Sequence, residues 1–157
     1  KIHMFDVDVA DEQRYYRESD LFEPGTEIVY LDTPFARVGL SVCYDLRFPE
    51  LYRALFESQV DMITAPSAFT RVTGGAHFEL LMRARAVENS CFMLAACQGG
   101  EHDSGRQTYG HTMVVSPWGD ILGELGSGEG VLVVDLDLDL VEQVRRDMPL
   151  HSQRRLR

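Results

Sequence analysis

A short apolar run breaks into the start of a helix in Val38-Gly39-Leu40-Ser41-Val42-Cys43-Tyr44-Asp45-Leu46-Arg47-Phe48-Pro49-Glu50. Residues Arg37 to Val42 predict a buried strand, and Pro49 suits the first turn of a helix that we expect from Pro49 to Glu57. Cys43 then lies at the carboxyl end of a strand, where the reactive residues of α/β folds gather. Cations or backbone N–H groups can activate a thiol in such a position. The segment indicates an α/β fold with Cys43 as candidate nucleophile, although a cysteine taken alone is more often a reduced core residue.

Apolar runs alternate with helical patterns along the rest of the chain, which is typical of an α/β domain. We expect strands at 28–31, 60–65, 92–96, 112–116, 121–125 and 131–136. We expect helices at 76–89, with Gly74-Gly75 marking the start, and at 138–146. Residues 99–106 predict a loop, and the basic tail 150–157 is expected to leave the core. The length of 157 residues falls within the range of one domain.

The chain is acidic, with a formal net charge of −10 and a pI near 4.8. This charge argues against nucleic acid or an anionic membrane as partner, because phosphate binding requires a basic surface. Three cysteines without a C-x-x-C pair predict reduced thiols and a cytoplasmic location. No apolar run approaches the ~18 residues of a membrane span. No His or Cys pattern indicates a metal site.

Five motifs, including the Cys43 segment, follow one another along the chain at plausible spacing. They are Lys1–Asp6, Glu18, Cys43–Glu50, His77–Asn89 and Tyr109–Gly119. Together they resemble the carbon-nitrogen hydrolase (nitrilase) superfamily, and within it the branch of deaminated glutathione amidases and ω-amidases. The resemblance implies a four-layer αββα sandwich, an enzyme without cofactor, and a homodimer or larger homo-oligomer.

The resemblance also implies a Glu-Lys-Cys triad, with the lysine at Lys1 and the nucleophile at Cys43. The triad glutamate has no counterpart in this sequence, because relatives carry it on a preceding stretch. We therefore expect residues 1–157 to be the C-terminal portion of a single hydrolase domain, with the N-terminal strands absent or supplied by another chain. We do not expect this portion alone to be an active, stable monomer.

The chemistry of amide hydrolysis assigns roles to these residues. It needs a nucleophile, here Cys43, and donors for the tetrahedral oxyanion, here the Lys1 ammonium and the Tyr44 N–H, which follows the nucleophile. Glu18 matches an accessory catalytic glutamate near the lysine. As isolated residues, Lys1 and Glu18 would both be interpreted as solvated surface side chains.

Residues around these groups are expected to support them. We expect Arg47 to brace the turn through a carboxylate such as Glu50. His77 and Glu79 resemble a motif that braces the nucleophile region, although Glu79 also has the spacing to pair with Arg83. Two further residues, Arg71 and Thr73, are expected to bind substrate, and two histidines, His3 and His111, to be structural.

The predicted function is hydrolysis of a small carboxamide through a Cys43 thioester, releasing ammonia and then a carboxylic acid. The segment Gln98 to Gly110 favours a 2-oxo-acid amide such as deaminated glutathione over 2-oxoglutaramate, the ω-amidase substrate. Two other hypotheses remain. The chain could be an inactive structural remnant, since the triad glutamate is absent, or a redox-sensing thiol protein, although it has no resolving cysteine near Cys43 in sequence.

Overall fold

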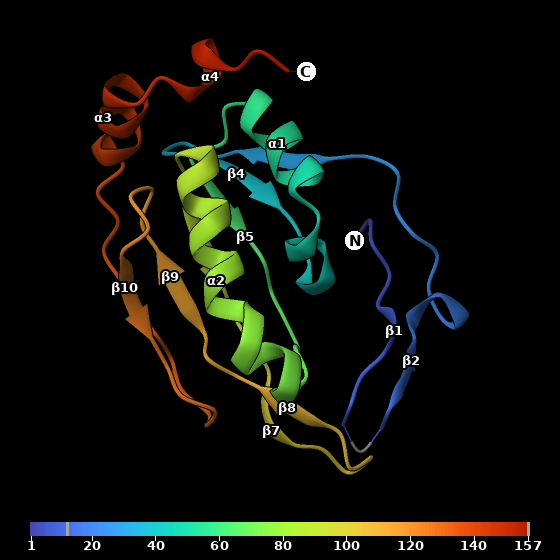
Figure 1. Cartoon of the computed structure of the whole chain (residues 1–157). Coiled ribbons are helices and arrows are strands. Elements are labelled where there is room, and N and C mark those ends of the chain that lie inside the picture. The colour runs from blue at the N-terminus through green and yellow to red at the C-terminus, as the bar shows by residue number, and fades with distance from the viewer. Residues whose placement is uncertain (12, 157) are drawn as a thin grey trace.

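The computed structural model describes residues 1–11 and 13–156, which are built around a six-stranded mixed sheet (Figure 1). The strand order is β10-β9-β6-β5-β4-β3. The central strands β4, β5 and β6 are parallel, and each edge is extended by antiparallel pairing. The strands are β3 Val29–Asp32, β4 Arg37–Leu40, β5 Met62–Thr64, β6 Phe92–Ala95, β9 Met113–Val115 and β10 Ile121–Glu124. The predicted α/β class is confirmed, and each predicted strand within this sheet is present with shifts of up to two residues at its ends.

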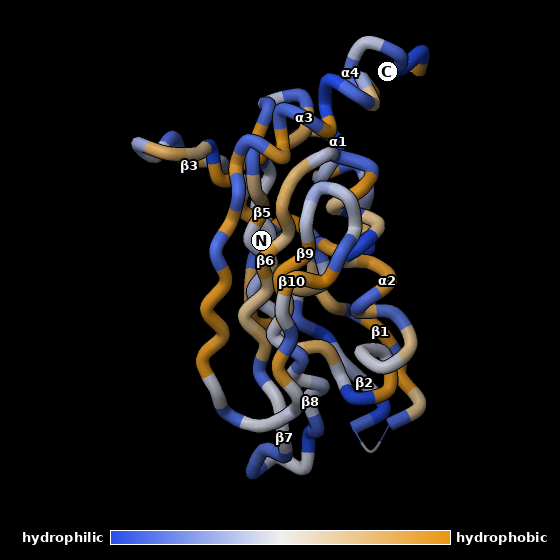
Figure 2. The backbone as a smooth tube through the Cα atoms, turned by 90° about the vertical axis from the view of Figure 1, so that its left-hand side faces the viewer, coloured by the Kyte–Doolittle hydropathy of each residue, from blue (hydrophilic) through white to orange (hydrophobic). Residues whose placement is uncertain are grey.

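Helices cover one face of this sheet. The main core is formed where α1 (Pro49–Glu57) and α2 (Arg71–Asn89) pack on residues such as Ile63 and Met93. Because side chains alternate along a strand, Met62 and Phe92 point to the opposite face. There they form a smaller core with the segment leading into α3 (Asp139–Asp147). Figure 2 shows that segment running along the side of the sheet away from α2. The chain thus supplies a helical layer and one large sheet.

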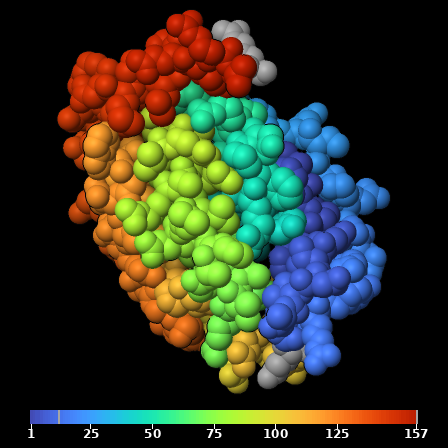
Figure 3. Space-filling model, in the orientation of Figure 1, coloured from blue at the N-terminus to red at the C-terminus, as the bar shows by residue number. Residues whose placement is uncertain are grey.

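Two short ribbons flank the end of the sheet that carries Cys43. The first pairs β1 (Asp6–Asp8) with β2 (Tyr15–Arg17) and continues into the short helix η1 (Glu18–Asp20). Figure 3 shows this N-terminal part, in blue, packed beside the teal and green residues that follow β4 and begin α2. The second pairs β7 (Gly99–Glu101) with β8 (Gln107–Tyr109). The predicted loop at 99–106 is confirmed for residues 102–106 but was wrong for 99–101, which form β7 and pair with residues 107–109.

Helix α2 begins five residues before the predicted start. Thr70 caps it by accepting the N–H of Thr73 at 3.2 Å, so Gly74 and Gly75 lie inside the first turns. A Cβ at Gly74 would overlap the side chain of Tyr109. This glycine permits close packing of α2 on β8 and does not mark a helix boundary, which is why the sequence pattern was misleading.

One prediction for the C-terminal region was also wrong. The segment 131–136 alternates in burial as a strand does, with Val131 and Val133 87% and 85% exposed, but it pairs with no strand of the described chain. The tail leaves the core as predicted, since none of its helical residues is buried and Leu156 is 87% exposed. It forms α4 (Leu150–Gln153), and Arg154 forms an ion pair with Glu57 at the end of α1. Among the helices of the described chain, none combines the length and apolar character that crossing a membrane requires.

Candidate active site

The backbone turns sharply at Cys43, shortly after β4 ends at Leu40. Cys43 has φ = +51°, a left-handed conformation that is uncommon for a residue with a side chain. Its N–H donates to the Pro66 carbonyl at 3.0 Å, and it begins the short helix η2 (Cys43–Arg47). The N–H of Ala68 points at its sulfur, with N and Sγ 3.5 Å apart. The turn therefore presents the thiol to a pocket of about 520 Å³.

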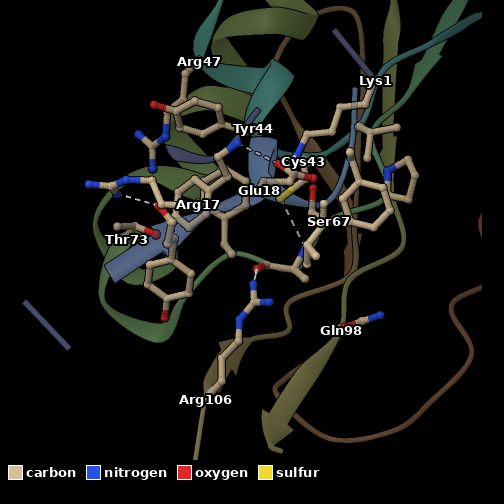
Figure 4. A pocket seen from close by; sticks show the side chains of 18 of the residues that line it. Lys1, Arg17, Glu18, Cys43, Tyr44, Arg47, Ser67, Thr73, Gln98 and Arg106 are labelled. Carbon is tan, nitrogen blue, oxygen red and sulfur yellow. Dashed lines mark hydrogen bonds and ion pairs between the residues drawn. The ribbon is translucent and has the colours of Figure 1, made fainter. Parts of the chain in front are cut away.

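Lys1 and Glu18 line the same pocket as Cys43 (Figure 4). The Lys1 ammonium forms an ion pair with Glu18, whose Oε2 also accepts the N–H of Phe5 at 2.7 Å. The two side chains are only 14% and 24% exposed, so the pair is largely shielded from solvent screening. Three of the residues that the sequence assigned to catalysis are thus brought together around one cavity, although 42 positions of the sequence separate the thiol from the lysine.

A buried carboxylate holds the two parts of the site together. Asp45 is 1% exposed and accepts the N–H groups of Ile2 and His3, at 3.3 and 2.9 Å, and that of Val42, at 2.9 Å. His3 adds a contact from Nδ1 at 2.8 Å and stacks on Phe48. Asp45 therefore ties the segment that carries Lys1 to the turn that carries Cys43. Sequence reasoning missed this role, although an acidic residue two positions after a nucleophile at a helix start is a usable signal.

Arg47 lies in the pocket and does not contact Glu50, so the predicted brace was wrong. Its Nη1 lies 3.2 Å from His77 Nδ1, and its guanidinium lies 5.2 Å from the centre of the Phe69 ring. Burial lowers the pKa of Arg47. Within the described residues no carboxylate forms an ion pair with it. Arg47 is therefore a half-buried cation whose charge faces the cavity.

The structure separates the two residues of the predicted bracing motif. His77 contacts Arg47 and so supports a pocket residue. Glu79 forms an ion pair with Arg83 at 3.2 Å, and both side chains are about half exposed. The structure therefore shows the alternative expected from the sequence, in which Glu79 pairs with Arg83. Glu79 does not brace the region around Cys43.

The two predicted substrate-binding residues also differ. Thr73 lines the pocket, whereas Arg71 lies outside it, at a smaller cavity beside the β1–β2 ribbon. The role of Arg71 stays a prediction: Arg71 is the first residue of α2 and borders only the smaller cavity, whereas Thr73 is two positions further along and borders the main pocket. Arg106, which sequence reasoning missed, lines the pocket from the β7–β8 hairpin. Finding it requires knowing that this hairpin folds toward Cys43.

The comparisons with known proteins agree with this architecture. The family model for carbon-nitrogen hydrolases matches residues 1–146. The chain belongs to the carbon-nitrogen hydrolase family.

Its relatives are similar over nearly the whole chain. A deaminated glutathione amidase of Yersinia enterocolitica is 48% identical over 155 residues, which are 99% of this chain and 54% of the relative. The crystal structure of the C. elegans NitFhit protein superposes with a TM-score of 0.86 at 42% identity, over 99% of this chain and 38% of that one. A mutant amidase of Nesterenkonia sp. AN1, with the acetamide moiety of fluoroacetamide covalently added at its active site cysteine, gives a TM-score of 0.70 at 34% identity, over 87% and 51%. The chain spans about half the length of the curated relatives it matches.

The other two cysteines of this carbon-nitrogen hydrolase do not face the pocket. Cys91 is fully buried, and burial raises its pKa to about 12. Burial also raises the pKa of Cys97 to about 12. At neutral pH both remain thiols, which are poor nucleophiles. The two histidines expected to be structural are held by contacts, His3 by Asp45 and His111 by stacking on Tyr109.

Proposed function

We propose that this chain carries the catalytic centre of an amidase that cleaves a small carboxamide through a thioester on Cys43. The observation that carries the proposal is the convergence of the Cys43 thiol and the Lys1–Glu18 pair on one pocket. Membership of the carbon-nitrogen hydrolase family supports the reaction class. The printed name of the relatives, deaminated glutathione amidase, supports the choice of substrate.

In the first half of the reaction, Cys43 Sγ attacks the amide carbon and the carbonyl oxygen becomes an oxyanion. The Lys1 ammonium and the Tyr44 N–H are the proposed donors to this oxyanion. The Tyr44 N–H lies in the first turn of η2, where backbone N–H groups have no acceptor within the helix. The C–N bond then breaks, and the leaving nitrogen takes the proton that the thiol gave up. In the second half, water attacks the thioester, releasing the acid and restoring the thiol.

The proton transfer requires a base. Within the described pocket lining, Glu18 is the carboxylate, and it is engaged by Lys1 and the Phe5 N–H. The family resemblance implies another glutamate, for which this sequence has no counterpart. We propose that this other glutamate is the base, whereas Glu18 holds the Lys1 ammonium in place. Assembly as a homo-oligomer and a cytoplasmic location are parts of the same proposal.

The charge at Arg47 favours an acidic substrate. A half-buried guanidinium that faces a cavity binds a carboxylate through strong, charge-assisted hydrogen bonds. A 2-oxo-acid amide carries such a carboxylate on its acyl half. We propose deaminated glutathione as the substrate, with 2-oxoglutaramate as the weaker alternative.

Mass spectrometry of the full-length protein tests the proposal. During turnover of deaminated glutathione, wild type should carry an acyl adduct on the peptide that contains Cys43, and Cys43→Ala should carry none. A covalent adduct that persists in Cys43→Ala would refute the nucleophile. The kcat/KM values for deaminated glutathione and 2-oxoglutaramate then rank the substrates, and a higher value for the latter would make the protein an ω-amidase.

A further inference from the structure

Arg106 projects into the pocket from the β7–β8 hairpin, directly before β8 begins. Its Nη2 donates to the Ala68 carbonyl at 2.6 Å, and its guanidinium lies 5.6 Å from the centre of the Tyr16 ring. Its Nε is buried and finds no acceptor among residues 1–11 and 13–156. Within the same residues, Nη2 is the one guanidinium nitrogen with an acceptor. Most of the hydrogen-bonding capacity of this cation is therefore unused.

The other charges nearby are already engaged. Asp11 accepts the Tyr16 hydroxyl at 2.8 Å and the N–H of Arg14 at 2.8 Å. Arg17, the third arginine of the pocket lining, donates to two backbone carbonyls and pairs with Asp8 at 3.2 Å. Arg47 and Arg106 are thus the two pocket arginines without a carboxylate partner in the described chain. Figure 4 shows them approaching the Cys43 sulfur from different sides.

Arg106 also borders a second cavity outside the main pocket. This second cavity, of about 150 Å³, shares Gln13, Tyr16 and Arg106 with the main pocket. A leaving group as small as ammonia would need neither the second cavity nor a second cation. A substrate with carboxylates on both sides of the scissile amide would use the second cavity and both arginines.

We propose that Arg106 is a specificity-determining residue that binds a carboxylate on the amine half of the substrate, while Arg47 binds the acyl half. The proposal rests on the proposed function and deepens it. The substrate class is an amide that joins a 2-oxo acid to an amino acid or short peptide with a free carboxyl terminus. When the C–N bond breaks, the leaving nitrogen takes its proton and departs as this amino acid or peptide, in place of the ammonia expected from the sequence.

A matched pair of substrates tests this directly in the full-length protein. One is deaminated glutathione, whose amine half is a dipeptide with a free carboxylate, and the other is the same molecule with that carboxylate converted to an amide. Wild type should prefer the free carboxylate by about 10- to 100-fold in kcat/KM, as expected for a hydrogen bond between charged groups. Arg106→Met should reduce this preference to near unity, mainly through KM, and Arg106→Lys should restore part of it.

Arg83→Met is the matched control, because it removes the same charge from an exposed site on α2, where Arg83 pairs with Glu79, and it should keep the wild-type preference. The proposal is overturned if wild type treats both substrates alike. It is also overturned if Arg106→Met slows both substrates equally, because Arg106 would then only position Ala68. If Arg106→Met fails to fold, the wild-type comparison and Arg106→Lys decide. Failure of the proposed function gives a different result, no turnover of either substrate, and the proposal falls with it.

Discussion

Two parallel strands of the sheet, β4 and β6, present the cysteines at their carboxyl ends differently. Cys43 follows β4 and Cys97 follows β6, so both lie at the carboxyl edge of the sheet. Cys97 continues the strand direction, donates its N–H to Thr112 Oγ1 at 2.9 Å, and turns its sulfur away from the pocket that its neighbours Ala96 and Gln98 line. Cys43 leaves the strand direction through its positive φ. The comparison teaches that position at the strand edge is not sufficient, and that the backbone turn aims the side chain.

The largest expected effect separates the two thiols by activity. Cys43→Ala should reduce amide turnover by about 10⁴-fold or more, since it removes the proposed nucleophile. Cys97→Ala is the control, and it should keep activity within about threefold because its sulfur does not reach the pocket. Steady-state kcat/KM on deaminated glutathione measures both. Comparable losses in the two variants would show that Cys43 and Cys97 do not differ in their contribution to catalysis.

Alkylation sharpens the same comparison without mutation. A thiol with a pKa of about 12 is only about 10⁻⁴ thiolate at pH 8, about 10³-fold less than an unperturbed thiol. Iodoacetamide at pH 8 should therefore label Cys43 and leave Cys91 and Cys97 almost unmodified, as peptide mapping would measure. Equal, slow labelling of all three would favour the inactive remnant instead.

Glu18→Gln tests whether the charged surroundings distinguish Cys43 from Cys97. Loss of the carboxylate that holds the Lys1 ammonium should lower kcat by about 10²-fold, as removal of one oxyanion donor does, with little change in KM. Asp20→Asn, an exposed change in the same short helix η1, is the matched control. A rise in KM alone would show that Glu18 binds substrate and does not position Lys1.

Asp45→Asn tests the hydrogen bonds by which Asp45 joins the Cys43 turn to the N-terminal segment. Cys97 is not held in this way by a buried carboxylate of the described chain. Replacing a buried carboxylate that accepts three backbone N–H groups should lower the free energy of unfolding by about 2 kcal/mol. Urea denaturation measures this loss. Asp32→Asn, which removes an exposed partner of Arg37, should change it by less than about 0.5 kcal/mol. Equal effects would show that Asp45 contributes no more to stability than a surface carboxylate does.

The smallest effect concerns pH. Because burial raises the pKa of Cys97 from 9.0 to about 12, the unfolded chain loses this proton at lower pH than the folded chain. Unfolding is then favoured as pH rises from about 9 to 12, so this thiol should lower stability by about 1 kcal/mol at pH 10. Urea denaturation at pH 8 and 10 should show a smaller alkaline loss in Cys97→Ala than in wild type. An identical alkaline loss of stability in both proteins would show that folding does not raise the pKa of Cys97.

The sequence predicted what local patterns decide. Pro49 and the apolar spacing after it gave helix α1 with both ends correct, and the strand before Cys43 was placed within two residues. Features that depend on distant contacts were missed. Gly74 looked like a helix boundary because its neighbour Tyr109 lies 35 positions away, and Arg106 reaches the pocket only because β7 pairs with β8. The meeting of Lys1 with Cys43 was expected from family resemblance alone, and its physical basis is Asp45.

The way Asp45 joins the site has a consequence for how the molecule loses function. The thiol belongs to the large sheet, whereas the ammonium belongs to an N-terminal ribbon of two short strands, docked largely through His3, Phe5 and their few contacts. Such a ribbon is a unit of low local stability and opens before the sheet does. Mild denaturant should then separate the Lys1 ammonium from the Cys43 thiol while the main core is still intact. Loss of amidase activity should therefore precede the loss of secondary structure.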